Sequence, residues 1–182
     1  MITINTKSLK AACLVAATKD VRYYLNGVQV LVREDGEAFI RATDGTVAFE
    51  DIQAHEAPGP VDLIIPIDVA KGAAKSKASV IDLVAVGDGQ YTLAGYIFKP
   101  IDGKFPDIDR VMPKRSPEHD ATVAHYDADL LARCQAAMRL ATGKSKAFFK
   151  VQNSPTGLVH RENEEYPRCA IMPLRPSAFE GN

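Results

Sequence analysis

The chain has 182 residues, of which 46% are hydrophobic and 25% charged, a composition typical of one large globular domain or slightly more than one small domain. No apolar run approaches the roughly 18 residues that a membrane span needs, and the first residues lack the layout of a secretion signal. The net charge of −1 excludes a uniformly basic protein, and three widely spaced cysteines (Cys13, Cys134 and Cys169) argue against disulfides and zinc and favour the cytoplasm.

The predicted elements recur in the same order in three units, which Pro-rich stretches at 56–60 and 113–117 separate. In the first unit, hydrophobic periodicity predicts a strand at 1–5, a helix at 6–18 capped by Thr6 or Ser8, and strands at 22–32 and 37–53. The turn Glu34-Asp35-Gly36 predicts that the last two strands form a hairpin.

The second unit predicts a strand at 61–66, a short helix at 67–79, and strands at 80–86 and 90–101 around the turn Gly87-Asp88-Gly89. The third predicts a strand at 121–125, a helix at 127–142, and strands at 147–153, 157–161 and 168–174. Gly143 is placed to end the third helix in a left-handed cap. The predicted fold class is therefore α+β: repeated strand–helix–strand–strand units of about 60 residues, with amphipathic antiparallel sheets packed on helices.

The charges are segregated by element. The predicted helical segments at 6–19, 67–79 and 127–146 hold ten basic and three acidic residues and carry +7, whereas the rest of the chain carries −8. One interpretation is that lysines extend from helix ends to solvent. The other is a helical surface that follows a polyanion through its phosphates, without base readout. The candidate phosphate-binding residues are Lys7, Lys10, Lys71, Lys75, Lys77, Arg133, Arg139, Lys144 and Lys146.

Motifs for catalysis are weak. Gly143-Lys144-Ser145 resembles the end of a phosphate-binding loop, but Met138 stands where that loop needs a glycine, and a predicted helix precedes it instead of a strand. The aspartates 102, 107 and 109 do not match the calcium-loop spacing. The four histidines lack metal-ligand spacing and no nucleophile motif surrounds a cysteine. We therefore expect no metal, no cofactor and no enzyme activity.

Four strings of residues resemble, in family order, motifs of the bacterial sliding clamp, the beta subunit of DNA polymerase III. They are Val21-Arg22-Tyr23-Tyr24-Leu25-Asn26-Gly27, Ala42-Thr43-Asp44-Gly45, Ile101-Asp102-Gly103-Lys104-Phe105-Pro106-Asp107 and Met172-Pro173-Leu174-Arg175. By this resemblance, residues 1–115 correspond to the middle domain of the clamp, residues 116–176 to the second half of its last domain, and residues 177–182 form a tail.

The resemblance implies a processivity factor of DNA polymerase that encircles duplex DNA, independent of base sequence, as a ring of identical chains with helices inside. It also implies a pocket that docks short apolar peptides of the polymerase and the clamp loader. The implied lining is Leu25, Thr43, Gly45, Val47, Pro106, Arg110, Val111, Ile171, Met172 and Pro173. The chain departs from the family at Thr46-Val47-Ala48, where clamps usually have His-Arg-Leu, so part of the pocket is expected to be wider or weaker.

An odd half-domain has a consequence for assembly. Pairing of the third unit with its copy about a two-fold axis would complete a domain, and four chains of three units would supply the twelve units of a ring. The alternative function is an interaction protein that binds clamp-binding peptides, as a decoy or regulator, without encircling DNA. A third possibility, an enzyme that uses the loop from Asp102 to Asp109, has less support.

Overall fold

The computed structural model describes residues 1–53, 59–113, 125–144, 148–151, 156–161 and 164–174. The strands are β1 (Ile2–Asn5), β2 (Gly27–Val32), β3 (Ala38–Thr43), β4 (Val47–Gln53), β5 (Val61–Pro66), β6 (Val80–Gly87), β7 (Gln90–Leu93), β8 (Tyr96–Phe98), β9 (Phe148–Val151), β10 (Gly157–His160) and β11 (Arg168–Ile171). The helices are α1 (Thr6–Val15), α2 (Ile67–Ala73), α3 (Ile108–Val111) and α4 (Ala128–Thr142), with a short 3₁₀ helix at Tyr23–Leu25.

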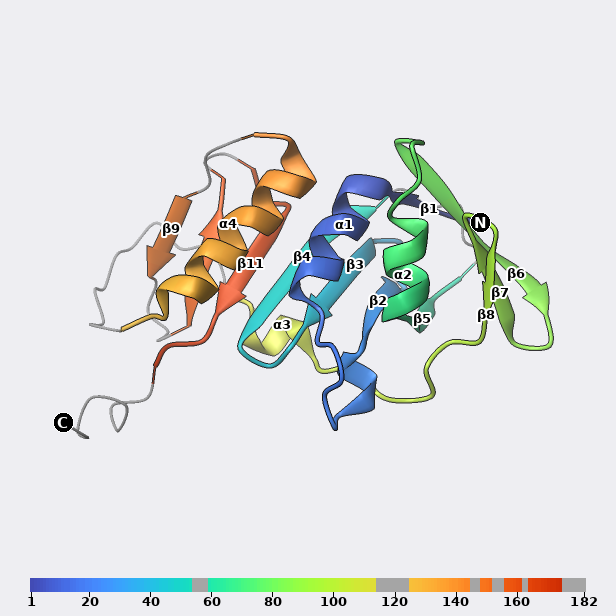
Figure 1. Cartoon of the computed structure of the whole chain (residues 1–182), viewed down its shortest axis with the longest axis horizontal. Coiled ribbons are helices and arrows are strands. Elements are labelled where there is room, and N and C mark those ends of the chain that lie inside the picture. Colours follow the sequence, from blue (N-terminus) through green and yellow to red (C-terminus); the bar gives the residue numbers. More distant parts are fainter. Residues whose placement is uncertain (54–58, 114–124, 145–147, 152–155, 162–163, 175–182) are drawn as a thin grey trace.

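The strands form two antiparallel sheets, in the orders β1-β6-β7-β8 and β5-β2-β3-β4-β11-β10-β9. The first strand of each of the first two units pairs with a strand of the other unit, β1 with β6 and β5 with β2, so these units are interlocked. Helices α4, α1 and α2 lie in a row against the sheets (Figure 1). The predicted α+β class with antiparallel sheets packed on helices is confirmed.

The third unit extends the sheet of the first. β11 pairs with β4 in antiparallel register, from Arg168 opposite Glu50 to Ile171 opposite Val47. On the same side of the sheet, α4 packs along α1. The junction between the two units is therefore a continuous sheet under a pair of helices, although more than a hundred residues of chain separate the two paired strands.

The first helix begins at Thr6, one residue earlier than a Thr6 cap would place it and three residues earlier than a Ser8 cap would. Asn5 is the N-cap, because its side-chain oxygen accepts from the backbone N–H of Lys7 at 2.9 Å and of Ser8 at 3.4 Å. The hydroxyls predicted as caps are used elsewhere, since Thr6 donates to the carbonyl of Ala78 and Ser8 to the carboxylate of Asp51. The helix ends at Val15 and α2 ends at Ala73, so both are shorter than predicted.

The third helix matches its prediction closely. Asp127 caps α4 through the N–H groups of Asp129 and Leu130, and Gly143 ends it in the left-handed conformation with φ of 71°. Local signals suffice here because the periodicity and both caps lie within one stretch of sequence.

Three predicted strands are interrupted. The strand at 22–32 begins only at Gly27, since Tyr23–Leu25 form the 3₁₀ helix. The strand at 37–53 is two strands, β3 and β4, because a turn at 44–46 with Gly45 at φ of 92° reverses the chain. The strand at 90–101 is likewise β7 and β8, with positive φ at both Ala94 and Gly95 between them. Within the described residues, the first two units thus have three strands after the helix instead of the predicted two, and the third unit has the three that were predicted.

Some predictions concern residues outside the described ranges. The proposed domain boundary at 115/116, the strand residues 121–124 and 152–153, the tail 177–182 and Lys146 all lie there. His125, the last residue of that predicted strand, is outside any strand, and its carbonyl accepts from the N–H of Leu174 at 2.7 Å. Within the described residues, no helix combines the length and apolar character needed to cross a membrane.

Both faces of the seven-stranded sheet are covered. The helices bury one face, where Val47 and Phe49 of β4 and Ile171 of β11 join the large core. On the opposite face, Ala48 and Ala170 join a second cluster, which the segment 101–112 covers with residues that include Phe105 and Ile108. Because side chains alternate along a strand, neighbouring residues of β4 and β11 serve different faces.

A buried carboxylate joins the units across this outer face. Glu50 of β4 is fully buried and binds two guanidinium groups, that of Arg41 on β3 and that of Arg168 on β11, the latter at 2.7 Å. Arg41 also binds Asp109 of α3 at 2.7 Å. One acidic side chain thus links the sheet of the first unit to the third unit and, through Arg41, to the covering segment.

We predict that Glu50→Gln lowers the free energy of unfolding by about 3–5 kcal/mol, because it removes the buried anion that Arg41 and Arg168 share and leaves Arg41 with Asp109 alone. Urea denaturation measures this change. Glu37→Gln is the matched control: Glu37 pairs with Arg33 at an exposed site, where such a pair contributes about 1 kcal/mol or less. Equal losses in the two variants would contradict this account of the junction.

Candidate functional site

A cavity of about 210 Å³ opens where the first unit, the covering segment and the third unit meet. The first unit contributes Arg22, Tyr24, Leu25, Thr43, Gly45, Thr46, Val47 and Ala48; the covering segment contributes Pro106, Ile108 and Val111; and the third unit contributes Thr156, Ala170 and Met172. The volume is below that of a typical pocket for a drug-sized ligand and suits a few apolar side chains. Met172 is 45% exposed at this site, and its flexible thioether suits ligands of varied shape.

Seven of the ten residues implied by the family resemblance line this cavity: Leu25, Thr43, Gly45, Val47, Pro106, Val111 and Met172. Three do not. Ile171 is fully buried in the helix-side core, because it alternates with the cavity residues Ala170 and Met172. Arg110 is exposed, and neither it nor Pro173 lines the cavity.

Sequence reasoning missed seven lining residues: Arg22, Tyr24, Thr46, Ala48, Ile108, Thr156 and Ala170. Five of them had a usable signal. Thr46 and Ala48 belong to the string in which the chain departs from the family. Arg22 and Tyr24 stand in the first family string, and Ala170 stands two residues before Met172, on the same face of a strand. Thr156 has no such signal, because only the folded third unit brings it to the cavity.

The turn between β3 and β4 forms one wall of the cavity and is held by its own side chains. Asp44 Oδ1 accepts from the N–H of Thr46 at 2.8 Å and of Val47 at 3.0 Å. Thr43 Oγ1 accepts from the N–H of Gly45 at 3.0 Å and donates to the carbonyl of Val47 at 2.7 Å. These bonds satisfy the backbone of a turn whose Gly45 has positive φ.

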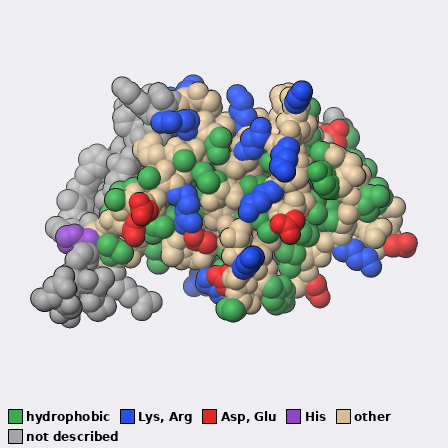
Figure 2. Space-filling view, in the orientation of Figure 1, with side chains coloured by type: hydrophobic (Ala, Val, Ile, Leu, Met, Phe, Trp, Pro, Cys, Tyr) green, Lys and Arg blue, Asp and Glu red, His purple; other side chains and the backbone are tan. Residues whose placement is uncertain are grey.

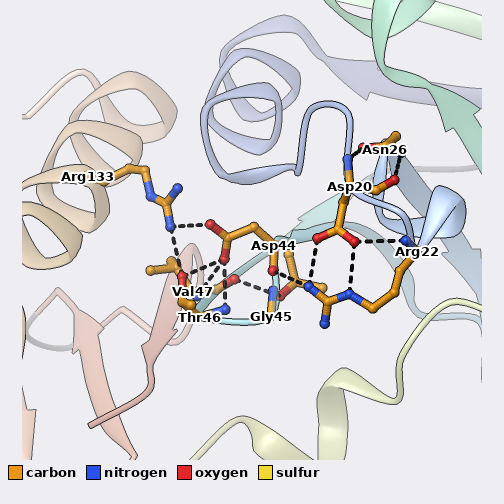
Figure 3. Close-up of polar contacts among 9 residues, drawn as sticks. Asp20, Arg22, Asn26, Asp44, Gly45, Thr46, Val47 and Arg133 are labelled. Atoms are coloured by element: carbon orange, nitrogen blue, oxygen red, sulfur yellow. Dashed lines mark hydrogen bonds and ion pairs between the residues drawn. The ribbon is translucent and has the colours of Figure 1, made fainter. Parts of the chain in front are cut away.

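Two guanidinium groups reach this turn from opposite sides (Figure 3). On one side, Arg22 donates to the carbonyl of Asp44 at 3.1 Å and binds Asp20 at 2.7 Å. The hydrogen bonds from Arg22 lower the pKa of Asp20 to about 2, and Asp20 in turn raises the pKa of Arg22. Asn26 fixes the Asp20 backbone by accepting from its N–H and donating to its carbonyl.

On the other side, Arg133 of α4 binds Asp44 Oδ2 at 2.6 Å and donates to Thr46 Oγ1 at 3.2 Å. Burial alone would raise the pKa of Asp44, but the hydrogen bonds from Val47, Thr46 and Arg133 outweigh it and lower that pKa. The sequence placed Arg133 among the phosphate-binding residues, but here its guanidinium is bound to a carboxylate of the first unit. Arg133 is therefore not part of the exposed basic surface of the helices.

The remaining basic candidates lie on the helical side. Lys7, Lys10, Lys71, Lys75, Lys77, Arg139 and Lys144 are all exposed, and Lys144 also binds Glu164 at 2.8 Å. In Figure 2, basic side chains gather over the row of helices, with few acidic ones among them. We call this set of residues the basic helical surface. It lies on the helical side of the seven-stranded sheet, opposite the covering segment.

The aspartates of the covering segment do not form a metal site. Asp109 binds Arg33 at 2.6 Å and Arg41 at 2.7 Å, so its carboxylate is occupied by cations of the chain. Within the described residues, no three acidic, histidine or cysteine side chains gather where they could hold a metal ion. The enzyme interpretation of the loop from Asp102 to Asp109 therefore gains no structural support.

Comparison with known proteins adds to this geometry. No protein-family model matches the chain. The beta sliding clamp of Caulobacter vibrioides is 36% identical to it over 137 residues, which cover 69% of this chain and 35% of that protein. The chain is related to the bacterial beta sliding clamp. It spans about a third of the length of the curated clamps that it matches.

Solved sliding clamps share the fold. The clamp of Pseudomonas aeruginosa superposes with a TM-score of 0.72 at 18% identity, over 95% of this chain and 65% of that one. The Helicobacter pylori beta clamp bound to a DNA ligase peptide gives 0.73 at 12% identity, over 96% of this chain and 66% of that one. The predicted clamp-like arrangement of the units is therefore confirmed at the level of fold.

We predict that Gly45→Ala lowers the free energy of unfolding by about 2 kcal/mol, against about 1 kcal/mol for Gly36→Ala. Both glycines have positive φ, but an added Cβ would lie 2.9 Å from Arg22 Nη1 at Gly45 and meets nothing within 4 Å at Gly36. Urea denaturation of both variants separates backbone strain from the displacement of Arg22. Equal losses would show that Arg22 can move away from this turn without cost.

Proposed function

We propose that this chain is a DNA sliding clamp, a non-catalytic processivity factor that encircles duplex DNA and docks peptides of its partners. One observation carries the proposal: a single sheet, continuous across two units, has the basic helical surface on one side and an apolar cavity between the units on the other. The two tasks of a clamp, holding DNA and holding a polymerase, require such a separation.

On the DNA side, exposed lysines and Arg139, on or next to three helices, supply attraction to phosphates without a fixed register. Lys10 of α1 and Lys71 and Lys75 on and next to α2 are examples. Affinity of this kind comes from counterion release and carries no base information. A protein bound in this way can move along the duplex over low barriers, which is what a processivity factor working beside a polymerase needs.

On the opposite side, the cavity suits a short apolar peptide. Its lining is mostly apolar, and Arg22 is its charged residue. The Helicobacter pylori clamp, which shares the fold, has been solved with a DNA ligase peptide, and this supports the class of ligand. For this chain we propose peptides of a DNA polymerase and of the clamp loader.

A ring requires several copies of the chain. β9 lies at one end of the seven-stranded sheet. The described part of the third unit places one helix, α4, against the sheet, whereas the first two units together place two, α1 and α2. We propose that third units of two copies pair about a two-fold axis, and that four chains complete a ring of twelve units.

The alternative is a peptide-binding decoy or regulator that does not encircle DNA. It would use the same cavity, so only the DNA side distinguishes the two functions. A clamp stays on circular DNA and slides off linear DNA, and its loading depends on a loader ATPase, whereas a decoy shows neither property.

We predict that changing Lys10, Lys71 and Lys75 together to Gln weakens duplex binding and reduces the slope of log affinity against log salt by about 3, one for each lost phosphate contact. Fluorescence anisotropy with a short duplex at several salt concentrations measures this. The control changes Lys99 and Lys104, which are exposed but lie outside the helices. If the control lowers the slope as much, the DNA does not bind the helical side.

For assembly, we predict a solution mass of four chains by light scattering, with retention on nicked circular DNA after incubation with a loader ATPase and ATP, and loss from the same DNA after linearisation. A monomer at every concentration, with no difference between circular and linear DNA, would rule out the ring and favour the decoy.

A further inference from the structure

The wall of the cavity formed by the β3–β4 turn depends on a contact from another unit. Asp44 divides its two carboxylate oxygens: Oδ1 serves the turn itself through Thr46 and Val47, and Oδ2 binds Arg133 of α4. Thr46 is held twice in the same way, because its hydroxyl donates to Asp44 Oδ1 at 2.7 Å and accepts from Arg133. Figure 3 shows Asp44 between α4 on one side and Arg22 on the other.

The ion pair between Arg133 and Asp44 is partly buried, which strengthens its hold on the turn. The side chains of Arg133 and Asp44 are 27% and 20% exposed, so solvent screens their attraction less than it screens a surface pair. At 2.6 Å, this charge-assisted bond is slightly shorter than the usual range of about 2.7–2.9 Å. It also closes a long loop, since 89 residues separate the two partners in sequence.

The residues so held face the ligand. Thr46 and Val47 line the cavity, whereas Asp44 and Arg133 do not. A second hydrogen bond connects the turn to the third unit: the N–H of Met172 donates to the carbonyl of Thr46 at 2.9 Å. This bond holds the backbone of the turn and does not involve its side chains. Loss of Arg133 would therefore loosen the cavity wall without unfolding the junction.

We propose that Arg133 is a positioning residue of the peptide cavity: through Asp44 Oδ2 and Thr46 Oγ1 it sets the β3–β4 turn as a rigid wall for the bound peptide. The inference rests on the proposed peptide-binding function and adds a residue to it from outside the cavity. It also assigns Arg133 a task other than phosphate binding, because its charge is already matched by Asp44.

The chain offers a matched control on the same helix. Arg139 belongs to α4 as Arg133 does, but it is exposed and is part of the basic helical surface. Arg133→Gln and Arg139→Gln remove the same charge from the same helix, so a difference between them reports position and not net charge.

The test measures the dissociation constant of a fluorescein-labelled DNA ligase peptide for the full chain. Arg133→Gln should weaken binding between threefold and tenfold, and Arg133→Lys should restore most of the loss. Arg139→Gln should leave peptide binding unchanged and weaken duplex binding. Asp44→Asn, which keeps Oδ1 as an acceptor for the turn, should weaken peptide binding about as much as Arg133→Gln, and the double variant should lose little more.

If the peptide does not bind even to the unchanged chain, that result counts against the proposed function alone. Hydrogen exchange then tests the role of Arg133 independently of peptide binding. Arg133→Gln should speed hydrogen exchange at the amides of Thr46 and Val47, which donate to Asp44, while Arg139→Gln should not. Unchanged exchange at both amides, or unchanged peptide affinity in Arg133→Gln, would overturn the inference. So would equal losses of duplex affinity in the two arginine variants.

Discussion

The pairing of β4 with β11 is the constraint on which the rest of this molecule depends. It joins segments far apart in sequence into one sheet, and the buried carboxylate of Glu50, shared by Arg41 and Arg168, links the two strands across it. Without that junction the third unit would have no fixed place beside the first. The helices α1 and α4 would then not form one layer, and the cavity would lose the wall that carries Met172.

Strand alternation at this junction divides the work between two faces. Val47 and Phe49 point into the helix-side core, and Ala48 points toward the covering segment. Because neighbouring residues of a strand face opposite sides of the sheet, a cationic helical layer and an apolar cavity can lie close together, with Val47 at the end of β4 bordering both the helix-side core and the cavity. The Arg133–Asp44 pair also links the two sides, since it connects a helix of the basic layer to the cavity wall. The proposed function needs this arrangement, because the DNA would have to stay free to slide while a partner peptide stays bound.

The sequence predicts features whose cause is local. The span and both caps of α4 follow from one stretch of periodic residues, and the family strings locate most of the cavity. Reading 37–53 as one strand overlooks the turn dipeptide Asp44-Gly45, because strand-like residues continue on both sides of it in a sheet whose two faces are both covered. The sequence does not predict the role of Arg133, since nothing near it in the chain points to Asp44, 89 residues away. The pairing of β1 with β6 and of β5 with β2 is not predicted either, because these partners are also far apart in the sequence.

Lysine footprinting by mass spectrometry tests the division of faces most directly. The chain is acetylated under mild conditions in the presence of circular duplex DNA, and separately in the presence of the DNA ligase peptide. The account predicts that DNA protects Lys7, Lys10, Lys71 and Lys75 and leaves Lys99 and Lys104 reactive, while the peptide protects none of the first four. Protection of Lys99 and Lys104 by DNA, with the helical lysines still fully reactive, would contradict it.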